Sequence, residues 1–77
     1  MSSLNWQCVF DGWRAFSSKM VNGYPMTYEV LYVKATQQWR LTGDREVVPR
    51  DELFDSRNEA QARAENLEAA AVKAVNE

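Results

Sequence analysis

The C-terminal segment FDSRNEAQARAENLEAAAVKAVNE constrains the fold most strongly, because it joins a helix start signal to a stripe of alanines. Ser56 and Glu59 have the spacing of a capping box, in which each side chain satisfies a free backbone N–H of the other residue. From this point we expect a helix with one stripe of mostly small residues, namely Ala60, Ala64, Leu67, Ala71 and Val75. Because such a stripe lets the helix backbone come close to its support, the rest of the chain must supply the bulky side chains.

The N-terminal part supplies bulky side chains in the alternating pattern of strands. In LNWQCVF, one face holds Leu4, Trp6, Cys8 and Phe10. A period of two is typical of a half-buried strand, so we expect Cys8 to be a buried structural thiol. Asp11-Gly12 is a residue pair that type I′ hairpin turns favour. This turn would place Phe10 opposite Trp13 and keep both on the apolar face.

The segment TYEVLYVK, residues 27–34, is the strongest strand candidate. Tyr28, Val30 and Tyr32 face one way, and Glu29, Leu31 and Val33 face the other. ATQQ then makes a short turn, WRLT returns as a strand, and REVVPRDELF predicts a short edge strand that Pro49 ends. We therefore expect residues 1–77 to form a single α+β domain. Its fold class would be a three- or four-stranded antiparallel sheet with one C-terminal α-helix packed on one face.

Composition excludes several kinds of activity. The chain has no His, which removes histidine-based catalysis and imidazole ligation of metals. Acidic residues between 44 and 55 are interleaved with Arg45 and Arg50, so we interpret them as a solvated connection rather than a metal site. We expect no catalytic residue, no cofactor and no metal. No apolar run or signal peptide is apparent, and one cysteine suits a reducing compartment, so we expect a soluble cytoplasmic protein without membrane contact.

A surface for a protein partner is predicted around the second turn pair, Asn22-Gly23. The segment from residue 20 to 26 is unusually apolar for a loop and is either a lid over the core or a recognition loop. A single helix leaves one sheet face uncovered, and we place Tyr28 and Tyr32 on that face, although the alternation allows either face. The predicted partner-binding residues are Met20, Val21, Tyr24, Met26, Tyr28 and Tyr32. They would bind another protein or form a homodimer interface.

The stretch YEVLYVKATQQWRLTG…ELFDSRNEAQARAENL, roughly residues 27 to 70, resembles a pattern of three strands followed by a helix. The arm-type DNA-binding domains of phage integrases are similar, as is the C-terminal half of double-stranded-RNA-binding domains. The integrase resemblance implies DNA reading by the sheet, with Lys34 and Arg40 as the obvious candidates. In size and acidity the chain is similar to small phage-encoded inhibitors of bacterial machinery, anti-CRISPR proteins among them.

The leading functional hypothesis is a non-enzymatic protein-binding module. More specifically, we expect a small accessory or inhibitor protein of a phage or other mobile element that acts on a host protein. The alternative is a nucleic-acid-binding domain of the integrase-arm type. A net charge of −2 disfavours this alternative, because contact with phosphates by Lys and Arg drives most of the affinity for nucleic acids.

Overall fold

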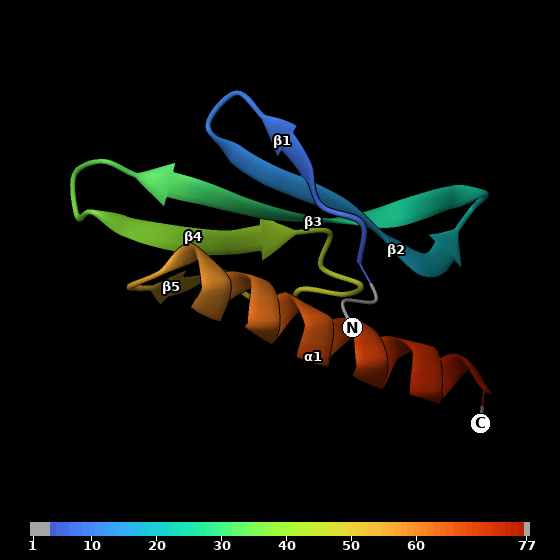
Figure 1. Cartoon of the computed structure of the whole chain (residues 1–77). Helices are drawn as coiled ribbons and strands as arrows, with labels where there is room; N and C mark the ends of the chain where they lie inside the picture. Colours follow the sequence, from blue (N-terminus) through green and yellow to red (C-terminus); the bar gives the residue numbers. More distant parts are fainter. Residues whose placement is uncertain (1–3, 77) are drawn as a thin grey trace.

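The computed structural model describes residues 4–76, with side chains up to residue 73. Five strands form one antiparallel sheet in chain order, namely β1 (Gln7–Val9), β2 (Gly12–Val21), β3 (Tyr24–Val33), β4 (Gln38–Gly43) and β5 (Glu52–Phe54). The helix α1 (Arg57–Asn76) crosses one face of this sheet (Figure 1). The predicted α+β class and C-terminal helix are confirmed. The expected three or four strands are too few, because a three-residue strand lies at each edge.

The first hairpin has a different turn from the one predicted. Val9 pairs with Gly12 and Cys8 with Trp13, so the turn is made by Phe10 and Asp11. Gly12 lies inside β2, where an added Cβ would overlap the carbonyl oxygen of Val30 on β3. The glycine is therefore required for close approach between two strands and not for a type I′ turn.

The second hairpin includes the residues that we predicted to form a loop. β2 continues to Val21 and β3 begins at Tyr24. The turn between them has φ values of 53° at Asn22 and 85° at Gly23, the left-handed conformation that type I′ turns require. Pro25 is tolerated because β4 pairs with β3 only from Tyr28 onward, so the missing N–H of Pro25 interrupts no ladder.

The helix covers the sheet face to which the even-numbered residues of β3 point. Met26, Tyr28 and Val30 are buried on this face, whereas Glu29 and Leu31 belong to the opposite, open face. The assignment of Tyr28 and Tyr32 to the uncovered face was therefore wrong, because both lie on the same face as buried Val30. The buried apolar core consists of Leu4, Ala15, Met26, Tyr28, Val30, Leu41, Val47, Val48, Ala60 and Ala64.

The connection from β4 to β5 contributes to the core without forming the predicted strand. Residues 44–51 make turns, and only Glu52–Phe54 pair with β4. The N–H groups of Val47 and Val48 both donate to the carbonyl oxygen of Asp44, at 3.0 and 2.8 Å. This local bonding replaces a sheet ladder and turns both valine side chains into the core.

The start and the stripe of the helix agree with the sequence prediction. The hydroxyl of Ser56 accepts a hydrogen bond of 3.1 Å from the N–H of Glu59, which is the Ser56 half of the predicted capping box, without the returning bond to the Glu59 side chain. Ala60 and Ala64 are fully buried, and Leu67 and Ala71 pack partly against the core. The side chain of Val75 lies outside the described residues. The stripe also contains Glu68, a buried carboxylate that the apolar pattern does not reveal.

Candidate functional site

The predicted partner surface does not exist as one continuous patch. Tyr28 has no exposed surface and Met26 is buried, because both lie beneath α1. Neither side chain can contact a partner of the folded protein. This corrects the prediction that both residues belong to the binding surface, and the physical reason is that the helix covers the face to which they point.

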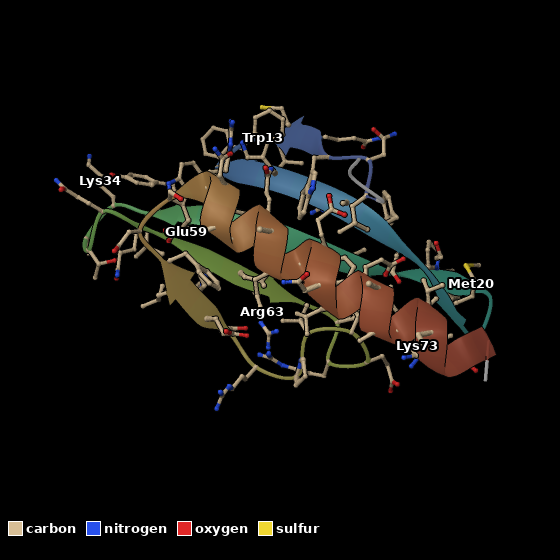
Figure 2. The ribbon with its side chains drawn as sticks, turned by 60° about the horizontal axis from the view of Figure 1, so that its bottom comes forward. Trp13, Met20, Lys34, Glu59, Arg63 and Lys73 are labelled. Atoms are coloured by element: carbon tan, nitrogen blue, oxygen red, sulfur yellow. The ribbon has the colours of Figure 1, made fainter. Side chains whose placement is uncertain are left out.

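The other four predicted residues divide between two ends of the sheet. Met20 and Tyr24 are exposed at the tip of the β2–β3 hairpin, while Val21 packs partly against the core. Tyr32 lies near the other end of β3, two residues before Lys34. Figure 2 shows Lys34 and Met20 at opposite ends of the molecule. The 20–26 segment and Tyr32 therefore cannot form one compact site.

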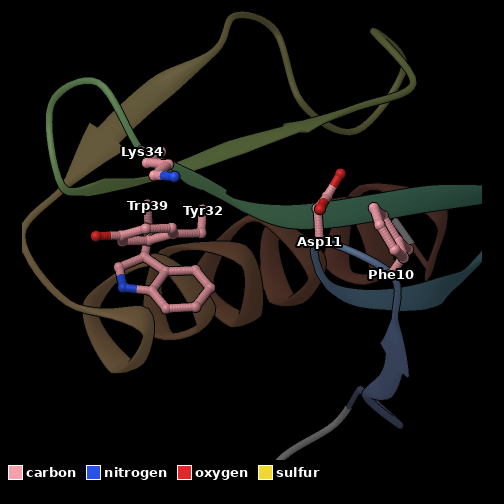
Figure 3. A pocket seen from close by; sticks show the side chains of 5 residues that line it. All are labelled: Phe10, Asp11, Tyr32, Lys34 and Trp39. Atoms are coloured by element: carbon pink, nitrogen blue, oxygen red, sulfur yellow. The ribbon is translucent and has the colours of Figure 1, made fainter.

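Tyr32 belongs to an aromatic hollow at the end of the sheet where the helix starts. Phe10, Asp11, Tyr32, Lys34 and Trp39 line an open hollow of about 460 Å³ (Figure 3). We call this group of five residues the aromatic hollow. It gathers three aromatic rings from the β1–β2 turn, β3 and β4, which are distant in the sequence.

The rings of Tyr32 and Trp39 form the floor of the aromatic hollow. These residues are direct partners across β3 and β4, and their ring centroids lie 5.2 Å apart at an angle of 57°. A tilted pair at this separation is a favourable arrangement of two aromatic quadrupoles. Tyr32 remains 44% exposed, so the contact with Trp39 leaves much of its ring available.

Phe10 is the most exposed aromatic side chain of the hollow, with 98% of its surface accessible. The turn position of Phe10 follows from the pairing of Val9 with Gly12. The Tyr32 N–H donates a hydrogen bond of 3.0 Å to the carbonyl oxygen of Asp11, and this bond fixes the turn beside β3. A phenylalanine held almost wholly in water has no packing role in the isolated chain, which makes it a candidate contact residue.

The polar side chains of the aromatic hollow offer both hydrogen-bond donors and acceptors. The Tyr32 hydroxyl, the Trp39 indole N–H and the Lys34 ammonium have no hydrogen-bond partner within the described residues. Figure 3 shows the Tyr32 hydroxyl and the Trp39 nitrogen on the same side of the ring pair. The Asp11 carboxylate and the oxygen of the Tyr32 hydroxyl are hydrogen-bond acceptors. Such a site can hold a largely apolar ligand that also carries a few polar groups.

A second cation lies near the aromatic hollow without lining it. The guanidinium of Arg57, at the first position of α1, sits 5.0 Å from the centre of the Trp13 ring. This is a cation–π contact between the first residue of α1 and a tryptophan of β2 that also packs partly against the core. Trp13 is therefore partly protected, while the rings of the aromatic hollow remain open.

The remaining reactive or charged groups do not converge on a site. Cys8 is exposed on the edge strand β1, beyond the reach of α1, so its predicted burial was wrong.

Within residues 4–76, no group of three or more His, Cys, Asp or Glu side chains is placed to hold a metal ion. The acidic residues between 44 and 55 instead enter separate contacts, such as Arg45–Asp51 at 3.0 Å and Arg63–Glu52 at 3.2 Å. The hydrogen bond from Thr42, followed by that from Arg45, lowers the pKa of Asp51.

The open face of the sheet is a mixed surface. Phe16 and Leu53 are about half exposed there, and Arg14 forms an ion pair of 3.3 Å with Glu29. Arg40 lies between Leu31 on β3 and Leu53 on β5 in the register. Arg40 is therefore on the open face, whereas Lys34 lines the aromatic hollow on the helix side. The two cations expected to read DNA do not share a surface.

Sequence reasoning named two of the five residues of the aromatic hollow, Tyr32 as a partner contact and Lys34 as a candidate DNA contact. Phe10 was placed on the inner strand face instead of in a turn, and Trp39 both packs partly against the core and lines the hollow. The cross-strand pairing of Tyr32 with Trp39 was nevertheless available from the two strands and the short turn between them. Asp11 carries no local signal of a binding role, and only the fold brings it and Lys34 to the same hollow.

Comparisons with known proteins give no additional assignment. Among the described residues, no helix has the length and apolar composition needed to cross a membrane. No family model matches the sequence, and neither a curated protein nor a solved structure matches it, so the functional interpretation depends on the aromatic hollow itself.

Proposed function

We propose that this protein is a non-enzymatic binding module that holds a segment of another protein in the aromatic hollow. The observation that carries the proposal is the exposure of Phe10, 98%, beside the Tyr32–Trp39 pair, in which Tyr32 is exposed and Trp39 partly buried. Tyrosine and tryptophan are enriched among residues that dominate binding energy at protein interfaces. Three aromatic rings around an open hollow give a partner apolar contact area, and the surrounding donors orient it.

The side chains of the hollow suit binding better than catalysis. Lys34 and Asp11 are exposed to water, so neither is placed in the desolvated setting that tunes a catalytic acid, base or nucleophile. The aromatic rings offer contact surface and no reactive group. We therefore assign recognition, and not a chemical step, to this end of the sheet.

A narrower form of the proposal concerns the biological setting. We propose an accessory or inhibitor protein of a phage or another mobile element, which acts on a host protein in the cytoplasm. Small size, net charge of −2 and a single cysteine support this form. Blocking a host protein requires a binding surface and no active site, and the aromatic hollow meets that requirement.

The nucleic-acid alternative of the integrase-arm type has weaker support. Arg14 and Arg40 are on the open sheet face, which such a domain would present to DNA, but Glu29 neutralises Arg14. Lys34 points to the other side of the sheet. A binding mode driven by phosphates needs several unpaired cations on one surface.

Selection from a library of random displayed peptides tests the proposal. The wild-type protein is the target, and Phe10→Ser is used in solution to remove peptides that bind elsewhere. Phe16→Ser is the matched control, because Phe16 is half exposed on the opposite face. We expect enriched peptides that bind wild type and Phe16→Ser equally and bind Phe10→Ser about tenfold more weakly, which corresponds to about 1.4 kcal/mol. Enrichment that ignores Phe10, or binding of duplex DNA with a strong salt dependence, would contradict the proposal.

A further inference from the structure

The tip of the β2–β3 hairpin extends beyond the part of the sheet that β4 supports. Past the irregularity in β2, two residue pairs join the two strands, Met20 with Pro25 and Val21 with Tyr24. Pro25 has no N–H to donate, and β4 pairs with β3 only from Tyr28 onward. Segments with few backbone hydrogen bonds and little buried apolar contact open locally at a low free energy. The tip can therefore open while the rest of the sheet stays paired.

The turn at this tip joins an asparagine to a glycine in water. Asn22 and Gly23 are both exposed, with φ values of 53° and 85°. The side chain of Asn22 has no hydrogen-bond partner within the described residues. A Cβ built on Gly23 would meet no atom within 4 Å, so the space around this backbone is open. The side-chain amide of Asn22 and the backbone nitrogen of Gly23 can therefore approach each other when the turn relaxes.

We infer that Asn22 is a site of spontaneous deamidation in the folded protein. The backbone N–H of Gly23 gives its proton to water or hydroxide, and the nitrogen attacks Cγ of the Asn22 side chain. A bond forms between this nitrogen and Cγ, the bond from Cγ to the side-chain nitrogen breaks, and that nitrogen leaves as ammonia. Water then opens the resulting succinimide ring. Its attack at Cγ gives aspartate, and its attack at the backbone carbonyl carbon gives isoaspartate.

Local opening of the tip supplies the geometry for this attack. In a type I′ turn the first central residue has a ψ of about +30°, so the backbone must rotate before the Gly23 nitrogen reaches Cγ. That rotation breaks the pairing of Val21 with Tyr24. The buried side chains of Tyr28 and Val30 lie farther along β3 and need not move. Deamidation therefore does not require unfolding of the sheet.

A second pair with related chemistry is protected by the fold. Asp11 precedes Gly12, and an aspartate can form the same ring with loss of water. However, the N–H of Tyr32 donates a hydrogen bond of 3.0 Å to the carbonyl oxygen of Asp11. An added Cβ at Gly12 would overlap the carbonyl oxygen of Val30, so this backbone lies tightly against β3. Rotation at Asp11 would require separation of β2 from β3. The open surroundings of Asn22, and not a following glycine alone, therefore make it the reactive site.

The modification would change both the charge and the backbone of the hairpin tip. Either product adds a carboxylate beside the exposed side chains of Met20 and Tyr24. Isoaspartate also lengthens the main chain within the turn, which disrupts the two-residue geometry that joins Val21 to Tyr24. The tip and Lys34, which lines the aromatic hollow, lie at opposite ends of the molecule (Figure 2). The inference is therefore independent of the proposed function.

Incubation of the folded full chain at neutral pH, followed by digestion with trypsin, tests the inference. Cleavage after Lys19 and Lys34 releases residues 20–34, in which Asn22 is the only asparagine. We expect this peptide to gain the mass that results from replacing NH₂ by OH. It should also separate on chromatography into an aspartate form and an isoaspartate form. Asn58 and Asn66 lie in α1 and in other tryptic peptides, and both should keep their mass.

Two comparisons separate local opening from other routes. Asn22→Gln is the matched variant, because its longer side chain would have to close a larger ring that forms more slowly, so its conversion should be lost over the same period. Guanidinium chloride below the unfolding transition strongly increases global unfolding, which exposes much surface, and hardly affects a local opening that exposes little. The conversion rate of wild type should therefore stay unchanged in this range. The chain unfolded in concentrated guanidinium chloride gives the reference rate.

Each remaining outcome overturns the inference. If the folded chain shows no conversion during the time in which the unfolded chain converts completely, the turn protects Asn22. If the rate rises with guanidinium chloride below the transition, the reaction requires global unfolding. Equal conversion at Asn58 or Asn66 would mean that the hairpin tip has no special reactivity. The same mass change in the 20–34 peptide of Asn22→Gln would assign the modification to another residue.

Discussion

The hydroxyl of Tyr28 donates a hydrogen bond of 2.9 Å to the carboxylate of Glu68, and this bond joins the central strand to the middle of α1. The same carboxylate accepts bonds of 2.5 Å from the Ser17 hydroxyl and 2.8 Å from the Ser18 N–H. Glu68 is 2% exposed, so these donors replace water around a buried charge. The helix is therefore held on the sheet by a polar anchor as well as by its alanine stripe.

Replacing the carboxylate of this anchor should reduce stability and its dependence on acid. Burial alone raises the pKa of Glu68, but the hydrogen bonds from Ser17, Ser18 and Tyr28 outweigh burial and lower the pKa below its ordinary value of 4.5. The carboxylate therefore contributes stability that is complete above pH 4.5 and is lost as the pH falls through the lower folded value. Glu68→Gln should cost about 1–3 kcal/mol at pH 7, because an amide N–H₂ replaces an acceptor.

The measurement is the urea midpoint at several values between neutral pH and pH 3. Wild type should lose more stability over this range than Glu68→Gln does. Asp11→Asn, at an exposed turn, is the control and should follow wild type. Equal acid dependence in wild type and Glu68→Gln would show that the carboxylate is not anchored in this way.

Removing the Tyr28 hydroxyl should change how the free energy of unfolding depends on pH above pH 10. Burial raises the pKa of this hydroxyl most, and the hydrogen bond and charge of Glu68 raise it further. Stability from the neutral phenol is complete below the unfolded pKa of about 10 and is lost as the pH rises toward the higher folded value. Tyr28→Phe should cost about 1–2 kcal/mol of stability at pH 7. Above pH 10 its free energy of unfolding should fall less steeply with rising pH than that of wild type, as guanidinium titrations at several pH values would measure. Tyr24→Phe, at the exposed hairpin tip, should retain the wild-type slope.

A charged side chain should destabilise the protein on the buried face of α1 and not on its exposed face. Ala64 is fully buried against the sheet, whereas Ala62, half a turn away, is exposed. Ala64→Glu should cost about 3 kcal/mol or more, because it places an unpaired charge in the core, while Ala62→Glu should change stability by less than about 0.5 kcal/mol. Thermal unfolding followed by circular dichroism compares the two directly. Similar melting temperatures would mean that the helix packs by another face.

Gly12 should be less replaceable than Gly23, although Gly23 has the left-handed backbone. A Cβ at Gly23 meets no atom within 4 Å, so Gly23→Ala costs only the left-handed strain of about 1–2 kcal/mol. A Cβ at Gly12 would overlap the Val30 carbonyl, and backbone atoms cannot move aside easily. We expect Gly12→Ala to be the more destabilising variant in urea denaturation. The opposite order would indicate that β2 does not approach β3 as closely as described.

The thiol of Cys8 should react in the native protein. Cys8 is exposed on β1, and its hydrogen bond to the Val9 carbonyl, at 3.8 Å, does not shield it. Ellman's reagent should therefore modify it at a rate close to that of the urea-unfolded chain. A native rate more than about tenfold slower would support the burial that the strand pattern suggested.

The sequence by itself determined the features that depend on neighbouring residues. The Ser56 cap, the Ala60–Ala64 stripe and the Asn22-Gly23 turn each follow from local backbone chemistry, and all three are present. The alternation in β3 likewise separated two groups of side chains correctly. It could not decide which group faces the helix, because a period of two treats both faces alike.

Tertiary structure decided the remaining features, which depend on contacts between distant segments. Glu68 can be buried only because donors on β2 and β3 meet it, and no helical pattern encodes those donors. Gly12 lies within a strand because β3 passes close to it, although its sequence context indicates a turn. The aromatic hollow exists because α1 begins at Arg57 and leaves that end of the sheet uncovered, so Tyr32 and Trp39 remain accessible beside Phe10.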